Sequence, residues 1–264
     1  MWPNHPLGKS LAGTTETVSG MTSQDLKGFH QHYYAPGNIV VAACGNLNHK
    51  KMVDLAKRKL GSIKKNEEWR FIKADHIQAK PKTRFFKKDI EQMPLALGMP
   101  GYAESHPDRY VLSMLSTILG GNMSSRLFVE VREKHGLAYS IVSSSKQLHD
   151  TGVFMVRAGV DNQKIVPAID LILKVLKKIK KEGTTAGEFT RARDYLLGQL
   201  LLGLEDTMDH MLWLGEGVIS KDKIRTLNSV IQEFEKITMK DIKRVAEQVL
   251  QRDVRLQVLR RHPA

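Results

Sequence analysis

Two side chains, Arg132 and Tyr139, have the residue types and the spacing that carbonyl chemistry requires. The run RLFVEVREKHGLAYS, residues 126–140, predicts an amphipathic helix that ends at Gly136 and turns into a strand. This geometry would fold Arg132, in the last helical turn, back toward Tyr139 at the start of the strand. A guanidinium and a phenol that meet at one point donate hydrogen bonds together, which suits a carbonyl oxygen that becomes negative during acyl transfer.

The same pair also has a purely structural interpretation. An arginine in the last turn of a helix complements the helix dipole, and a tyrosine that opens a strand is commonly half-buried packing. The residues alone favour this plainer interpretation and leave the catalytic one open.

The histidines form no recognisable zinc motif. None of the ten has a glutamate and a second histidine at the offsets of H-x-x-E-H, which holds zinc on a helix and lowers the pKa of its bound water. His30 and His32 are two apart and would point to different sides of a helix. Cys44 is the only cysteine, which excludes both a C-x-x-C motif and an internal disulfide. We therefore expect no metal and no other cofactor in this chain.

Composition narrows the classes of partner. The net charge is +13, and part of it lies in a lysine cluster at 174–181 that we interpret as the solvated face of a helix. Aromatic residues make up only 6%, and no nucleic-acid reading motif is present, so we expect no nucleic-acid partner. A basic surface instead favours acidic peptides or anionic membranes by long-range attraction.

The N-terminal run MWPNHPLGKS has no apolar signal region, and no run approaches the ~18 apolar residues of a transmembrane helix. Together with the single cysteine, this leads us to expect a soluble and cytoplasmic protein.

The order of elements predicts an α+β fold, because strands joined by a short turn precede a run of helices. Predicted helices cover 22–33, 48–60, 107–119, 163–181, 186–204, 207–219, 222–232 and 239–250. Predicted strands cover 38–44, 83–89, 94–99, 138–147, 152–160 and 254–260. The loop of Gly120, Gly121 and Asn122 lacks the lysine of a phosphate-binding loop, and a helix end followed by a serine N-cap explains it.

A faint internal repeat relates the two ends of the chain. Residues 21–27 match residues 237–243, and both predict a helix opened by a threonine N-cap, Thr22 or Thr238, with an acidic residue in the first turn. The offset places the start of the first copy well before Met1. The first domain is therefore expected to be only its C-terminal piece.

The run GGNMSSRLFVEVREKHGLAYS, residues 120–140, resembles the second domain of the pitrilysin-like zinc metallopeptidases. That family includes insulin-degrading enzyme, the mitochondrial processing peptidases and bacterial processing proteases. The likeness also covers the stretch from His5 to Leu47 and continues weakly to the C-terminus. It implies a mixed or antiparallel sheet covered by helices on one face. It also implies the C-terminal part of a truncated first domain at 1–63, a linker at 64–82 and a complete, zinc-free second domain at 83–264.

The resemblance also assigns roles. Arg132 and Tyr139 match the family's pair that binds and polarises the substrate carbonyl opposite the zinc. The loop of Gly120, Gly121 and Asn122 lies near the family's substrate chamber and would contact the peptide. Zinc and the carboxylate base would come from the absent half of the first domain or from a partner subunit. On this view the chain is inactive alone, and its partners are a peptide or unfolded protein and a zinc-bearing subunit or a second copy.

The alternative is a non-catalytic scaffold or peptide-binding homologue of the processing peptidases, of which the family also has examples. An intact Arg132–Tyr139 pair favours the peptidase interpretation for the parent protein. The missing zinc helix favours the scaffold interpretation for this chain as it stands.

Overall fold

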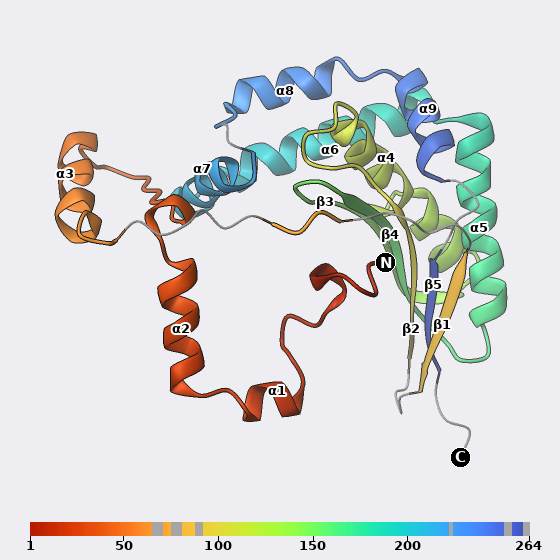
Figure 1. Ribbon diagram of the computed structural model, residues 1–264. Coiled ribbons are helices and arrows are strands. Elements are labelled where there is room, and N and C mark those ends of the chain that lie inside the picture. The colour runs from red at the N-terminus through yellow and green to blue at the C-terminus, as the bar shows by residue number, and fades with distance from the viewer. Residues whose placement is uncertain (65–70, 75–80, 88–91, 222–223, 251–254, 261–264) are drawn as a thin grey trace. The chain divides into compact units, whose positions relative to one another are not determined.

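Figure 1 shows a computed structural model of the chain, which describes all residues except 65–70, 75–80, 88–91, 222–223, 251–254 and 261–264. The described residues form two compact units. The first, which we call the sheet unit, holds Met1 and residues 76–201 and 225–264; the second, the helical unit, holds residues 2–75 and 202–224. The predicted α+β fold class is confirmed, whereas the predicted domain boundaries stay predictions.

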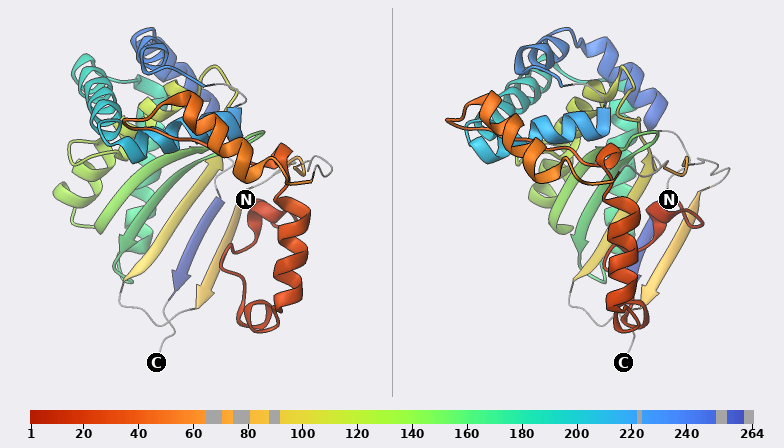
Figure 2. Two further views of the ribbon diagram at one scale, coloured as in Figure 1. Left: turned by 90° about the vertical axis from the view of Figure 1, so that its left-hand side faces the viewer. Right: turned by 60° about the vertical axis from the view of Figure 1, so that its left-hand side comes forward.

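The sheet unit is built on a mixed sheet with strand order β1-β5-β2-β4-β3. Its strands are β1 (Lys82–Lys87), β2 (Met93–Pro100), β3 (Ala138–Gln147), β4 (Gly152–Val160) and β5 (Arg255–Arg260). β1 and β5 pair in parallel, and the other neighbours pair antiparallel. Figure 2 shows the strands side by side in this order. The sheet therefore matches the mixed type that the resemblance implies.

One face of the sheet is buried under helices. The helices of this unit are α4 (Arg109–Gly120), α5 (Ile165–Glu182), α6 (Ala186–Gly203, whose last two residues belong to the helical unit), α8 (Leu227–Glu235) and α9 (Met239–Val249). α4 packs on β3 and β4, and α9 packs on α4 and α5 (Figure 1). Strand alternation supplies the core, because β2 buries Leu95 and Leu97 and exposes Pro94. Each such leucine stabilises the fold by about 1.5–3 kcal/mol on burial.

The lysine-rich helix α5 is amphipathic, as the sequence predicts. Ile172, Leu176 and Ile179 are buried, while the lysines at 174, 177, 178 and 181 are exposed. The cluster of charge is thus the solvated face of a packed helix. The helix ends before Gly183, whose φ of 77° is strained for residues with a Cβ.

The repeated threonine caps are present in both copies. Thr22 caps α2 (Ser23–Tyr33) and Thr238 caps α9, and in each case the side chain accepts a hydrogen bond from the N–H of the aspartate three residues on. In return, the carboxylates of Asp25 and Asp241 accept hydrogen bonds from the threonine N–H groups over 2.8 and 3.0 Å. Each cap stabilises its helix by about 1 kcal/mol.

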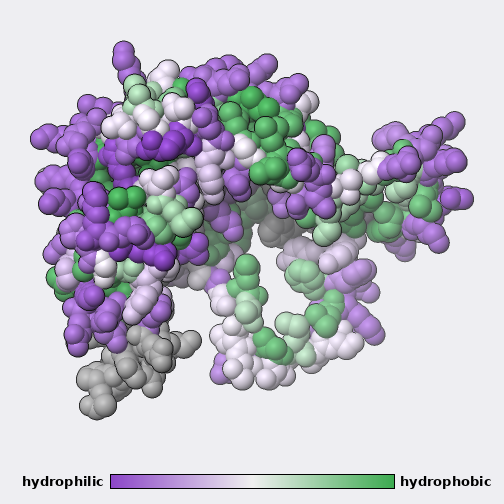
Figure 3. All heavy atoms as spheres, turned by 180° about the vertical axis from the view of Figure 1, so that it is seen from behind, coloured by the Kyte–Doolittle hydropathy of each residue, from purple (hydrophilic) through white to green (hydrophobic). Residues whose placement is uncertain are grey.

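The helical unit has little core of its own. It contains η1 (Pro6–Gly8), α1 (Thr15–Ser19), α2, η2 (Pro36–Asn38), α3 (His49–Leu60) and α7 (Thr207–Lys221). Ala35 is the one buried hydrophobic residue among its described residues, while Leu11, Leu26 and Phe29 are exposed. Figure 3 shows apolar residues at its surface. Exposed apolar surface of this kind is common at interaction sites, so docking of this unit on another chain or segment stays a prediction.

The strand predicted at 38–44 is wrong. Residues 39–44 form neither strand nor helix, and Val40 and Val41 are exposed. A strand needs a neighbour to pair its N–H and C=O groups, and the described residues of the helical unit supply none.

Parts of other predictions fall outside the described residues: most of the linker 64–82, and the ends of predicted elements at 88–89, 222–223 and 254. Among the described residues, no helix combines the length and the apolar character that crossing a bilayer requires.

Candidate carbonyl-binding site

The segment that carries Arg132 is wound more widely than an α-helix. Arg126 and Leu127 are α-helical, and η3 (Phe128–Lys134) continues them as a π-helix. π-Helices are rare in proteins overall, but many of those that occur lie at functional sites. The predicted end at Gly136 is confirmed, since this residue has a φ of 55°. The N–H of Gly136 donates to the carbonyl of Arg132 over 3.1 Å, and the N–H of Leu137 donates to that of Val131 over 2.9 Å. These bonds hold the start of β3 against the last helical turn.

Arg132 presents its guanidinium to solvent. Its side chain is 45% exposed and lies over the Phe128 ring, 4.6 Å from the ring centroid. Its Nε is 3.8 Å from a carboxylate oxygen of Glu133, which is too far for a hydrogen bond. The ring fixes the position of the charge and leaves its N–H donors available to a ligand.

Tyr139 occupies a β-bulge. Ala138 pairs with Val160 and Ser140 pairs with Gly159, so Tyr139 is the extra residue at the start of β3. Ala138 is buried, whereas the Tyr139 side chain is 62% exposed. Bulges of this kind re-aim a side chain. The tyrosine is therefore not the half-buried packing residue of the plainer interpretation.

Among the described residues, Arg132 and Tyr139 make no hydrogen bond with each other. Both side chains are exposed at the two ends of the turn that Gly136 makes. The structure thus brings the two donors to the surface from one helix-to-strand connection. It leaves their joint binding of a carbonyl a prediction.

A partly buried ion pair anchors this segment from its first residue. Arg126 Nε donates to Glu188 Oε1 over 2.6 Å, and Arg126 Nη2 donates to Glu188 Oε2 over 2.7 Å and to the Gly183 carbonyl over 2.9 Å. Burial by itself would raise the pKa of Glu188, but the hydrogen bonds from Arg126 and from the Thr185 N–H outweigh burial and lower the pKa to about 2. We call this ion pair between Arg126 and Glu188 the clamp. Leu127 and Val131, which follow Arg126 in the chain, are fully buried.

Sequence reasoning did not find this clamp. The two partners are 62 residues apart, and no local pattern links them. The available signal was the spacing of Thr185 and Glu188, because a threonine followed three residues later by glutamate is a capping box. The structure has that box: Glu188 N donates to Thr185 Oγ1 over 3.3 Å, and Thr185 N donates to Glu188 Oε2 over 2.9 Å.

The loop of Gly120, Gly121 and Asn122 has a clear packing role. A Cβ on Gly120 would lie 2.4 Å from the Ser143 nitrogen, so glycine lets the end of α4 touch β3. Asn122 Oδ1 accepts hydrogen bonds from the N–H and the hydroxyl of Ser124, which shapes the turn into the next helix. Contact between this loop and a peptide stays a prediction.

The described residues do not fit a zinc ion. No group of three or more histidine, cysteine, aspartate or glutamate side chains in the described ranges is arranged to hold a metal.

Comparison with known proteins assigns the chain to a family. Residues 20–196 match the family model described as the Peptidase M16 inactive domain. An uncharacterized zinc protease of Mycobacterium leprae is 34% identical over 253 residues, which cover 95% of this chain and 57% of the relative. One from Mycobacterium tuberculosis is 33% identical over 274 residues, 99% of this chain and 60% of the relative. The chain thus spans about three fifths of the length of the curated relatives it matches.

Solved structures give the same fold. A protease from Helicobacter pylori superposes with a TM-score of 0.87 at 26% identity, over 97% of this chain and 63% of that one. The M16 inactive domain from Pseudomonas fluorescens superposes with a TM-score of 0.89 at 23% identity, over 100% of this chain and 63% of that one. A chain of complex III2 from Candida albicans superposes with a TM-score of 0.88 at 19% identity, over 98% of this chain and 63% of that one. This chain therefore belongs to the M16 peptidase family, the pitrilysin-like family that its sequence resembles.

Proposed function

We propose that this chain contributes substrate binding and carbonyl polarisation to a pitrilysin-type zinc endopeptidase and is inactive alone. The observation that carries the proposal is the β-bulge at Tyr139, which the turn at Gly136 joins to the π-helix that carries Arg132. Both π-helical turns and β-bulges are found frequently at functional sites, where they place a side chain toward a ligand.

The chemistry follows from the two donors. The guanidinium of Arg132 and the phenol of Tyr139 donate hydrogen bonds to the oxygen of the scissile carbonyl. These bonds strengthen as the oxygen becomes negative, so they stabilise the transition state more than the bound peptide. The metal and the base belong to a partner chain or to a longer form of the protein.

The glycine loop supports peptide binding in this proposal. Gly121 is exposed, and Asn122 uses its Oδ1 within the loop while no described residue accepts from its Nδ2. That amide can donate to a peptide carbonyl.

A non-catalytic scaffold is the second candidate. It is favoured by the exposed apolar surface of the helical unit and by the absence of a metal-binding group among the described residues. The two candidates differ in whether the pair touches the reacting carbonyl.

The discriminating experiment is steady-state kinetics of the chain assembled with its zinc-bearing partner. Arg132→Ala and Tyr139→Phe should each raise the barrier by about 2–4 kcal/mol, seen in kcat more than in KM, as for a lost oxyanion donor. Tyr195→Phe, at an exposed tyrosine of α6, is the matched control and should keep the wild-type kcat. A wild-type kcat in both site variants would reduce the pair to a structural role.

A further inference from the structure

The sheet has a second face that the helices of the sheet unit do not cover. Residues paired across strands lie on one face, so the register places Arg84, Ala96, Arg157 and Val142 together, with β5 between the first two. Leu95 and Leu97 of β2 are buried on the other face, beneath the helices. We call this second surface the open face.

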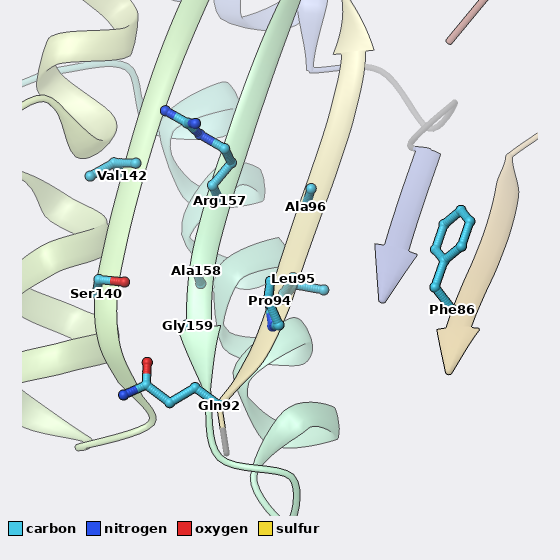
Figure 4. Close-up of a pocket in the computed structure, with 10 residues that line it drawn as sticks. All are labelled: Phe86, Gln92, Pro94, Leu95, Ala96, Ser140, Val142, Arg157, Ala158 and Gly159. Carbon is cyan, nitrogen blue, oxygen red and sulfur yellow. The ribbon is translucent and has the colours of Figure 1, made fainter. Parts of the chain in front are cut away.

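The open face contains a groove of about 700 Å³. Its floor is made of small residues, Pro94 and Ala96 of β2 and Gly159 of β4, and the taller Phe86 and Arg157 stand on either side (Figure 4). The groove exists because β2 carries no large side chain on this face. A volume of this size holds several side chains of a ligand.

The positive charge at the groove is unpaired. Arg157 lines the groove, and Arg84 lies on the same face outside the lining. Both are exposed, and neither has an ion-pair partner among the residues that the structure describes. The described residues that line the groove include no acidic side chain. Three strand spacings separate β1 from β4, so the two arginines stand roughly 14 Å apart. The net charge of +13 adds long-range attraction for an anionic ligand.

Polar groups lie at one end of the groove. A Cβ on Gly159 would be 3.1 Å from both Gln92 Oε1 and Ser140 Oγ, so the amide and the hydroxyl flank the floor. Such groups can bond the backbone of an extended chain. An apolar floor with backbone-binding groups at its edge suits a peptide better than a membrane surface.

We propose that the open-face groove binds an acidic peptide segment, whose apolar side chains fill the groove while its carboxylates pair with Arg157 and Arg84. This deepens the proposed function, on which it rests, by giving the peptide a preferred chemistry at a second place on the sheet unit. An extended chain advances about 3.3 Å per residue, so carboxylates four residues apart match the separation of the two arginines.

The test is fluorescence anisotropy of a labelled, C-terminally amidated peptide, Glu-Ala-Leu-Ala-Glu, titrated with the full chain at low salt. In an extended conformation its two glutamates and its leucine lie on the same side of the chain. Arg157→Gln removes one ion pair and should weaken binding about fivefold, and replacing both glutamates of the peptide by glutamine removes both pairs and should weaken it further. Arg157→Lys keeps the charge and should retain most of the affinity. Arg191→Gln removes an exposed charge from α6 and should leave binding unchanged.

Equal affinity for the glutamate and glutamine peptides would overturn the proposal, and so would wild-type affinity in Arg157→Gln. Stronger binding to anionic vesicles than to the peptide, lost in the same variant, would assign the face to a membrane instead and overturn it too. The assay needs neither zinc nor turnover. A failure here therefore leaves the loss of kcat in Tyr139→Phe as a separate test of the proposed function.

Discussion

At the scale of single residues, the clamp between Arg126 and Glu188 fixes the position of residues 126–140, the segment that carries Arg132 and Tyr139. The ion pair is bidentate, with oxygen–nitrogen distances of 2.6 and 2.7 Å. It links Arg126, the first residue of this segment, to Glu188 of α6. A planar guanidinium fixes orientation as well as distance, which a lysine would not do. Arg132 and Tyr139 lie further along the same segment, so the clamp also helps to fix their position.

The clamp makes stability depend on pH. The pKa of Glu188 is lowered from its ordinary value of 4.5 to about 2 in the folded chain. A carboxyl whose pKa is lower in the folded chain than in the unfolded chain stabilises the fold at pH values above its unfolded pKa. That stabilisation is lost as pH falls from about 4.5 toward 2. Urea denaturation should show Glu188→Gln less stable than wild type by about 2 kcal/mol at pH 7, with the difference shrinking below pH 4.

Glu182→Gln, at an exposed glutamate at the end of α5, is the control and should show no such pH-dependent difference. A constant difference between Glu188→Gln and wild type from pH 7 to pH 3 would mean that ionisation of this carboxyl does not stabilise the fold.

At the scale of elements, the helix-to-strand connection orients both site residues. Gly136 adopts a φ of 55°, and a Cβ there would meet no atom within 4 Å, so only backbone strain opposes substitution. Gly136→Ala should destabilise the chain by about 1 kcal/mol, and Gly136→Asn by less, because asparagine tolerates the left-handed conformation. Thermal unfolding of the two variants measures this order.

If alanine and asparagine were equally harmless at Gly136, the turn would not be held in the left-handed conformation in solution. If both substitutions abolished folding, backbone strain at Gly136 alone would not account for the loss of stability.

The connection also shows which features a sequence can and cannot predict. Amphipathic spacing, threonine caps and the glycine stop are local, so the structure confirms the caps at Thr22 and Thr238 and the stop at Gly136. Most predicted helices are present too, but the one expected at 222–232 lies at Leu227–Glu235, and residues 224–226 are not helical. The π-winding of η3 and the bulge at Tyr139 depend on how the segment packs, which no local pattern encodes. The strand expected at 38–44 has a strand's composition but no described partner, and composition cannot supply one.

At the scale of the whole molecule, the two units differ in kind. The sheet unit has a continuous buried core between its strands and its helices, whereas the helical unit exposes most of its described apolar side chains. The chain spans about three fifths of the length of the curated relatives it matches. The exposed apolar surface of the helical unit suits association with another chain or segment.

The most direct test of the central claim is zinc content measured together with cleavage of an unstructured peptide, first for the purified chain alone and then with a zinc-bearing partner of the same family. The account predicts no bound zinc and no cleavage for the chain alone, and cleavage in the mixture that depends on Arg132 and Tyr139. Stoichiometric zinc and chelator-sensitive cleavage by the chain alone would contradict it, because a complete metal site would then exist within these 264 residues.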